Sequence, residues 1–200
     1  MKNIAVFASG SGSNFQAIID AIQAGKLDAH VTLLVCDHQD AFVVERAKKL
    51  GIPSFVFQAK QYSSKEAYEK EIILELTNRD VDFVVLAGYM RILGPTLLSG
   101  YEGRIVNIHP SLLPAFPGKD AIGQALRAGV KESGVTVHYV DEGMDTGPII
   151  AQKSVSIDAN DTLESLQTKI HAIEHMLYPA VLQTLMTQGG TENDQKARTY

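Results

Sequence analysis

Residues 1–23 read MKNIAVFASGSGSNFQAIIDAIQ, and this stretch gives the strongest indication of fold class. The apolar, β-branched run Asn3–Ala8 predicts a buried strand, and the glycines after it lead into a helix predicted over Ser13–Ala24. Apolar residues recur along that helix at the spacing i, i+3, i+4, i+7, namely Phe15, Ile18, Ile19 and Ile22. A buried strand joined to an amphipathic helix by a glycine turn is the starting unit of a parallel α/β sheet.

The same alternation of strand and helix continues to about residue 188. Further strands are predicted at Val31–Cys36, Ser54–Phe57, Asp82–Ala87, Arg104–Ile108, Val135–Val140 and Ile149–Ile157. Further helices are predicted at Ala41–Leu50, Lys65–Asn78, Pro95–Tyr101, Ile122–Ala128 and Leu163–Met186. We therefore predict an α/β fold with a doubly wound, mostly parallel sheet, and at least one antiparallel pairing in the C-terminal half.

Residues 1–188 are expected to form a single domain whose two halves, about 1–100 and 101–188, flank the site. Residues 189–200 open with two glycines and are polar, so we expect a flexible tail.

Composition excludes several functional classes. The chain has 200 residues, of which 45% are hydrophobic, and a net charge of −5 from 18 basic and 23 acidic side chains. This balance argues against a general nucleic-acid binder, although it allows a small anionic substrate. The single cysteine, Cys36, cannot form an internal disulfide framework. The apolar run before the first glycines is too short for a signal peptide or a membrane span, so we expect a cytoplasmic protein.

The motif GSGSN at residues 10–14 follows the first predicted strand and opens the first helix. Gly12, Ser13 and Asn14 would present free backbone N–H groups to an anion. Phe15 stands where a dinucleotide fingerprint has its third glycine, so we favour a phosphate monoester over a pyrophosphate. Asp37, at the end of the second strand, is where a dinucleotide fold places its ribose-binding acid. The alternative is a plain glycine turn with a Ser or Asn cap.

A second motif, RIVNIHPSLLP at residues 104–114, ends a predicted strand with two polar side chains on one face, Asn107 and His109. An amide and an imidazole at a strand's carboxyl end can both donate hydrogen bonds to a developing oxyanion. A third motif, DEGMDTGP at residues 141–148, is a glycine loop that could bring the carboxylate of Asp145 to His109. A carboxylate beside an imidazole orients the ring and favours its protonated form.

The remaining histidines are weaker candidates. His30, His38 and His138 are expected to be structural or solvent-facing. His171 and His175 lie four apart on the last helix, a spacing that metal ligands use, but the sequence offers no third ligand, so we predict no metal site.

Together, GSGSN, AGYMRIL (87–93), NIHPSLLP (107–114) and DEGMDTGP closely resemble the folate-dependent phosphoribosylglycinamide formyltransferase family of purine biosynthesis, from the first strand to about Met186. The resemblance implies the Rossmann-like formyltransferase fold and transfer of a formyl group from 10-formyltetrahydrofolate, the co-substrate, to the amine of glycinamide ribonucleotide. The amine would attack directly, through a tetrahedral intermediate, with no metal. The partners implied are these small molecules, without nucleic acid or membrane, for a monomer or homodimer.

Site residues follow from the resemblance by position. Asn107, His109 and Asp145 would be catalytic, and Gly12, Ser13 and Asn14 would bind the substrate phosphate. Glu174 would contact the ribonucleotide. The folate would meet Lys65, Met90, Arg91, Ile92, Leu93, Val140 and Asp141. Two departures stand out: position 65 is often Arg in the family, and relatives carry a histidine near Asp120 or Ile122. We consider that Asp120 adds a second negative charge beside Asp145.

Four alternatives remain. Methionyl-tRNA formyltransferase carries an extra tRNA-binding domain, for which this chain is expected to be too short and too acidic. Formyltetrahydrofolate deformylase usually has an N-terminal regulatory domain, whereas here the fold is expected to begin at residue 3. A nucleotide-dependent oxidoreductase or a non-catalytic nucleotide-binding module would explain the glycine loop, but not the Asn107, His109 and Asp145 constellation.

Overall fold

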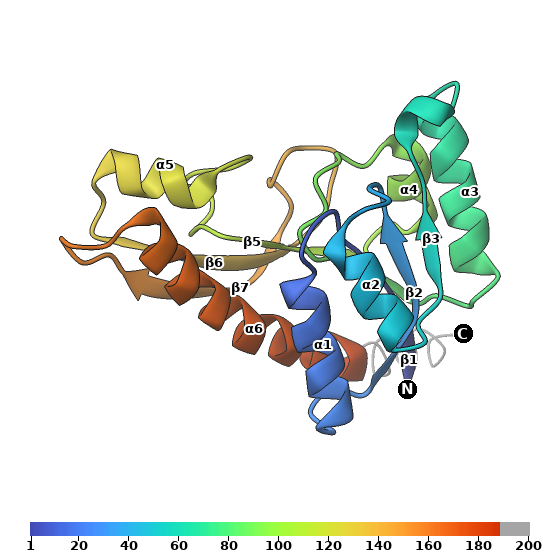
Figure 1. The fold of residues 1–200 in the computed structure, drawn as a ribbon, viewed down its shortest axis with the longest axis horizontal. Coiled ribbons are helices and arrows are strands. Elements are labelled where there is room, and N and C mark those ends of the chain that lie inside the picture. The colour runs from blue at the N-terminus through green and yellow to red at the C-terminus, as the bar shows by residue number, and fades with distance from the viewer. Residues whose placement is uncertain (189–200) are drawn as a thin grey trace, which may run out of the picture.

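A computed structural model describes residues 1–188, which form a seven-stranded sheet in the order β3-β2-β1-β4-β5-β6-β7 (Figure 1). The strands are β1 (Lys2–Phe7), β2 (Ala29–Cys36), β3 (Ser54–Val56), β4 (Phe83–Leu86), β5 (Ile105–His109), β6 (Glu132–Tyr139) and β7 (Ile149–Ser156). Strands β1 to β5 pair in parallel, whereas β5 with β6 and β6 with β7 pair antiparallel. The predicted mostly parallel sheet is confirmed, with two antiparallel pairings in the C-terminal half.

Helices cover both faces of the sheet. They are α1 (Ser13–Gln23), α2 (Phe42–Lys49), α3 (Lys65–Thr77), α4 (Pro95–Gly100), α5 (Ala121–Ala128) and α6 (Leu163–Gln188), with a 3-10 turn at Ala59–Gln61. Alternate residues of β1 face opposite layers: Ile4 and Val6 pack with α1, α2 and α6, whereas Ala5 and Phe7 pack with α3 and α4. The sheet is therefore doubly wound, and α6 lies beside α1 (Figure 1).

The predicted elements lie within three residues of the observed bounds. The largest difference is in β6, which begins at Glu132 rather than at the first apolar residue, Val135. The added residues pair with β7 through Gly134, where a Cβ would stand 2.3 Å from the Lys153 carbonyl oxygen. Backbone pairing, which apolar patterning does not detect, extends the strand. The 3-10 turn was not predicted, and the predicted tail, 189–200, lies outside the described residues.

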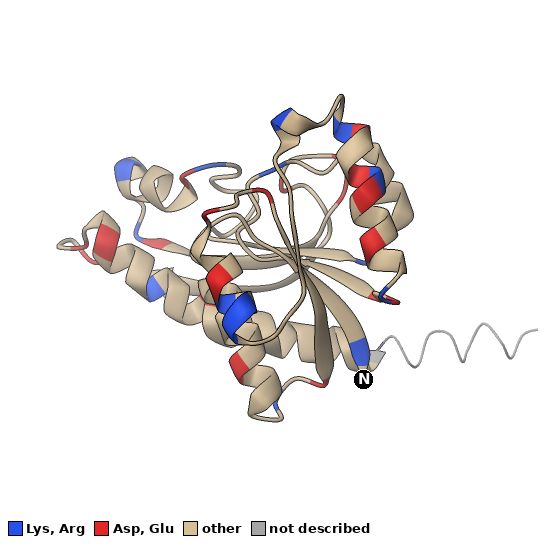
Figure 2. Ribbon diagram, turned by 45° about the vertical axis from the view of Figure 1, so that its right-hand side comes forward, with Lys and Arg blue, Asp and Glu red and all other residues tan. Residues whose placement is uncertain are grey.

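Acidic and basic positions are interspersed along the outer helices, and α3 carries both signs (Figure 2). Within residues 1–188, no helix is both long and apolar enough to cross a membrane.

The strands β4 and β5 are tied to the long helix α6 near their carboxyl ends. The hydroxyl of Tyr178, which is fully buried on α6, donates to the carbonyl oxygen of Leu86 at 2.8 Å and lies 3.2 Å from that of Val106. This contact fixes α6, and with it Glu174 one turn earlier, relative to the end of β5 that carries Asn107 and His109.

Candidate active site

A cavity of about 880 Å³ opens at the carboxyl ends of β1, β4 and β5. Open α/β sheets bind their ligands at this edge. The cavity brings together every residue that the family resemblance assigns to catalysis or to substrate binding. Its walls include Gly12, Ser13, Asn14, Lys65, Met90, Arg91, Ile92, Leu93, Asn107, His109, Val140, Asp141, Asp145 and Glu174.

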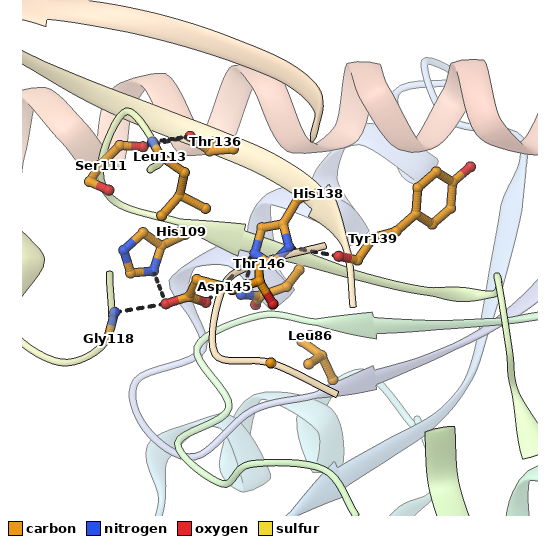
Figure 3. A network of polar contacts seen from close by, with 12 residues as sticks. Leu86, His109, Ser111, Leu113, Gly118, Thr136, His138, Tyr139, Asp145 and Thr146 are labelled. Atoms are coloured by element: carbon orange, nitrogen blue, oxygen red, sulfur yellow. Dashed lines mark hydrogen bonds and ion pairs between the residues drawn. The ribbon is translucent and has the colours of Figure 1, made fainter. Parts of the chain in front are cut away.

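His109 and Asp145 meet in this cavity as the sequence predicts. The Nδ1 atom of His109 lies 3.4 Å from Oδ2 of Asp145, and that oxygen also accepts the Gly118 N–H at 2.8 Å (Figure 3). The other ring nitrogen, Nε2, lies 2.9 Å from the carbonyl oxygen of Phe116. Both nitrogens of the buried ring therefore face hydrogen-bond acceptors. A protonated imidazole has two N–H groups and can donate to both acceptors, whereas a neutral one can donate to only one of them.

His138 completes this polar cluster, although it was expected to be structural or solvent-facing. Its side chain is 2% exposed and lies on the opposite side of the Asp145 carboxylate from His109 (Figure 3). Its Nε2 is 3.7 Å from Oδ1 of Asp145 and 3.3 Å from Nδ2 of Asn107, while Nδ1 donates to the Tyr139 carbonyl oxygen at 2.7 Å. A neutral His138 thus accepts the Asn107 amide, and a protonated one points its second N–H at Asp145.

Strand pairing explains this contact. Antiparallel β5 and β6 place His138 directly opposite Asn107, and directly opposed side chains of such a pair share one face of the sheet. The signal that could have found His138 is therefore the register of β6 on β5, rather than any motif around the histidine itself.

The pKa of the Asp145 carboxyl lies below its ordinary value. The interaction with the His138 ring is the main cause; burial works against it, and the Gly118 N–H and the His109 ring add to the lowering. Asp145 itself sits at a left-handed backbone position, φ 56°, which only a few per cent of non-glycine residues adopt. The site thus holds a charged carboxylate between two imidazoles.

The predicted phosphate loop forms the other end of the cavity. Gly12 takes a left-handed conformation, φ 72°, and a Cβ there would stand 2.5 Å from Cγ2 of Val43. No side chain caps the amino end of α1, so its first backbone N–H groups remain available to an anion. Behind the loop, Nε of Arg46 donates to the Ser11 carbonyl oxygen at 2.8 Å.

Asn14 and Glu174 meet at this end of the cavity, 160 residues apart in sequence. Nδ2 of Asn14 donates to Oε2 of Glu174 at 3.0 Å, and both residues are buried. Burial raises the pKa of the Glu174 carboxyl, while the Asn14 bond and the nearby His171 oppose that rise. Because its side chain is held by Glu174, Asn14 can offer an anion its backbone N–H.

The residues expected at the folate come from α3 and from the segments after β4 and β6, and they also line the cavity. Met90 and Ile92 expose their apolar side chains, and Nζ of Lys65 donates to the carbonyl oxygen of Ile92 at 3.0 Å. Val140 and Asp141 begin the glycine loop, where Asp141 accepts the Gly143 N–H at 3.0 Å and the Thr146 hydroxyl at 2.7 Å.

Other sequence candidates lie apart from this cluster. The carboxylate of Asp120 is 55% exposed and pairs with Arg127 at 2.8 Å, so our expectation that it charges the His109 environment does not fit the structure. The rings of His171 and His175 stack on α6, and the residues described contain no group of three or more metal-binding side chains. Cys36 is buried, and this burial raises the pKa of its thiol.

Comparison with known proteins gives concordant matches. Residues 2–182 match a family model described as formyl transferase. The chain is 58% identical, over 186 residues, to phosphoribosylglycinamide formyltransferase of Bacillus subtilis (strain 168), covering 93% of this chain and 95% of that protein. It is 44% identical to the enzyme of the same name from Escherichia coli (strain K12), covering 90% and 85%. A crystal structure of phosphoribosylglycinamide formyltransferase from Bacillus halodurans matches with a TM-score of 0.91 at 62% identity, covering 94% and 97%.

Proposed function

The chain belongs to the formyl transferase family, and on that premise we propose that it transfers the formyl group of 10-formyltetrahydrofolate to the amine of glycinamide ribonucleotide. The products are formylglycinamide ribonucleotide and tetrahydrofolate. One observation carries the proposal: a single cavity joins the open amino end of α1 to the Asn107, His109 and Asp145 cluster. A phosphorylated amine and an acyl donor therefore fit on either side of the same polar centre.

Asn107 and His109 stabilise the charge that develops on the formyl oxygen. They share one face at the carboxyl end of β5. The Asn107 amide keeps one N–H that His138 does not take, and the Nε2–H of His109 would exchange the Phe116 carbonyl oxygen for the formyl oxygen. Donors held in place before the reaction stabilise developing negative charge without reorganising. His138 orients the Asn107 amide from the opposite strand.

Asp145 holds His109 and helps to remove the proton that the attacking amine loses. Its carboxylate lies 3.4 Å from His109, and the lowered pKa keeps it charged, as both tasks require. The attack is direct, since the cavity residues include no Ser or Cys paired with a base in the manner of a covalent nucleophile.

The two substrates occupy different parts of the cavity. Gly12, Ser13 and Asn14 bind the phosphate through backbone N–H groups, and Glu174 contacts the ribonucleotide beside Asn14. The folate lies along residues 90–93, Lys65 and residues 140–141, where exposed apolar side chains and backbone groups are both presented. We expect a cytoplasmic enzyme that works as a monomer or a homodimer.

The test is to incubate the purified protein with 10-formyltetrahydrofolate and glycinamide ribonucleotide while recording folate absorbance. Turnover that requires both substrates, together with mass-spectrometric detection of the formylated ribonucleotide, supports the proposal. Release of formate without the ribonucleotide indicates a deformylase instead, and tight, saturable NAD binding indicates a dinucleotide enzyme.

A further inference from the structure

Asp37 is a buried carboxylate that the proposed reaction does not use. It follows β2 directly and is 8% exposed. An acid at this position binds ribose hydroxyls in dinucleotide folds. Here both of its oxygens are engaged within the chain: Oδ1 accepts the Ser9 hydroxyl at 2.6 Å, and Oδ2 lies 3.1 Å from Nε of Arg91. The carboxylate is therefore committed to internal contacts rather than to a ribose.

These contacts lead to the wall of the cavity. The Ser9 hydroxyl donates to Asp37, because a carboxylate can only accept. The hydroxyl oxygen of Ser9 in turn accepts the Met90 N–H at 2.9 Å. The guanidinium of Arg91 lies between Asp37 and the ring of Tyr68, whose centroid is 5.8 Å away. One carboxylate thus fixes two consecutive residues, one through its backbone and the other through its side chain.

The Met90–Gly94 segment is also held at its far end. Lys65 bonds the carbonyl oxygen of Ile92, and the Gly94 N–H donates to the buried carboxylate of Glu69 at 2.6 Å. The side chains of Met90 and Ile92, in contrast, are 63% and 56% exposed. The segment is therefore anchored from behind by charged groups while it presents apolar side chains on the cavity side.

We propose that Asp37, acting through Ser9 and Arg91, is a positioning residue that fixes the backbone of the Met90–Gly94 segment for folate binding. This inference rests on the proposed function, which places the folate against that segment. A binding segment whose conformation is already fixed loses less conformational entropy when the ligand binds, so its affinity for the ligand is higher. Loss of the Asp37 charge should therefore weaken folate binding, while the ribonucleotide end at Gly12–Asn14 stays intact.

Asp37→Asn is the sharpest variant, because it keeps the size of the side chain but only one acceptor. An Asn oxygen turned to Ser9 leaves an NH₂ group facing Arg91, and the reverse orientation leaves the Ser9 hydroxyl without its acceptor. We expect KM for 10-formyltetrahydrofolate to rise about tenfold, equivalent to about 1.4 kcal/mol. We expect kcat and KM for glycinamide ribonucleotide to stay within about twofold, a change below about 0.5 kcal/mol.

Ser9→Ala provides a second, independent test, because it removes the relay to Met90 and leaves the carboxylate with Arg91. Asp82→Asn is the matched control. Like Asp37, Asp82 contacts a cation and helps to hold a backbone N–H group. Its carboxylate accepts the Asn3 N–H at 2.8 Å and the Lys2 ammonium at 3.3 Å, but at the opposite edge of the sheet. Melting temperatures of all variants, and calorimetric titration with tetrahydrofolate, accompany the kinetics.

A selective rise in KM for the folate and in Kd for tetrahydrofolate, in Asp37→Asn and Ser9→Ala but not in Asp82→Asn, supports the proposal. Equal losses for both substrates, or unchanged folate affinity in a folded variant, overturn it. If Asp37→Asn does not fold, Ser9→Ala decides by the same criteria. Absence of formyl transfer in the parent protein counts against the proposed function instead, and tetrahydrofolate titration then still tests Asp37.

Discussion

Asp145→Asn tests whether the charge between the two histidines drives the reaction. Asn keeps the size of the side chain, and its carbonyl oxygen can still accept the Gly118 N–H, while its NH₂ group lies on the His138 side, where it shares Nε2 with the Asn107 amide. The fold of the loop should therefore survive the substitution. The main change is loss of the negative charge 3.4 Å from His109.

The magnitude follows from that distance. In the form of the site with His109 protonated, two unit charges 3.4 Å apart attract by roughly 5 kcal/mol at an effective dielectric of about 20. Water at the partly exposed site weakens this attraction, so we expect a loss of about 3–4 kcal/mol of transition-state stabilisation. Removal of one preorganised electrostatic partner typically has an effect of this size. That loss corresponds to a fall in kcat of about 10²–10³-fold.

Steady-state kinetics with both substrates measure the fall, and inhibition by inorganic phosphate shows whether the Gly12–Asn14 end is intact. Asp120→Asn is the matched control in the same cavity wall, because its carboxylate is exposed and paired with Arg127. Its kcat should change by less than about twofold, as exposed ion pairs contribute little. If Asp145→Asn retains kcat within about tenfold, roughly 1.4 kcal/mol, the charge is not part of the chemistry.

Stability gives a second readout with a definite sign. The pKa of the Asp145 carboxyl is lowered on folding, so the charged group stabilises the protein above its ordinary pKa, and this contribution disappears as the pH falls through the folded value. The melting temperatures of the parent and Asp145→Asn should differ near neutrality and converge in acid. A difference that grows toward low pH would contradict the interactions seen around Asp145.

Three further predictions concern the rest of the cavity. Asn107→Ala and His109→Ala should each lower kcat by at least about 10²-fold with small changes in KM, and steady-state rates within about tenfold of the parent would exclude that residue from the catalytic set. Inorganic phosphate should compete with the ribonucleotide in inhibition kinetics, and Gly12→Ala should abolish that competition because its Cβ has no room; phosphate inhibition unchanged in Gly12→Ala would refute this site. Burial raises the pKa of Glu174, so the folded state favours the protonated carboxyl, and the charged form above that pKa destabilises the fold. Glu174→Gln should therefore raise the melting temperature near pH 8 more than near pH 4. An equal effect at both pH values in thermal melts would argue against a raised pKa.

Much of this fold can be predicted from the sequence, because strands and helices are specified by patterns among neighbouring residues. Apolar runs fix the strands, and the amphipathic spacing in α1 fixes the buried side of that helix. The alternation of Asn107 and His109 along β5 is likewise a property of neighbouring residues, and the structure places both side chains on the cavity. Turn residues mark the element starts closely, since Gly12 directly precedes α1 and Pro95 begins α4.

The errors arise where a side chain's partner is distant in sequence. His138 looks like an ordinary strand histidine until the register of β6 on β5 puts it opposite Asn107. Asp37 has the position of a ribose-binding acid, and only the fold brings Arg91 to it. Asp120 is a different case, because its partner Arg127 is only 7 residues away, within the same α5 segment. For His138 and Asp37, the deciding contact depends on tertiary placement that no motif encodes.

The antiparallel direction of β6 places the start of the glycine loop at the amino end of β5, away from His109. A parallel strand following β5 would start at the opposite edge of the sheet, so the loop after it would begin where β5 ends. Instead β6 runs back along β5, and the glycine loop leaves beside Ile105, whose carbonyl oxygen accepts the Val140 N–H at 3.0 Å. The loop closes on itself where the Tyr139 N–H donates to the Pro148 carbonyl oxygen at 2.9 Å. From this closed neck the chain must extend back over the end of β5, and the Gly118 N–H then holds Asp145 against His109. The position of the carboxylate beside His109 therefore depends on the course of the loop and on its Gly118 contact, because strand direction alone leaves the start of the loop at the other end of β5.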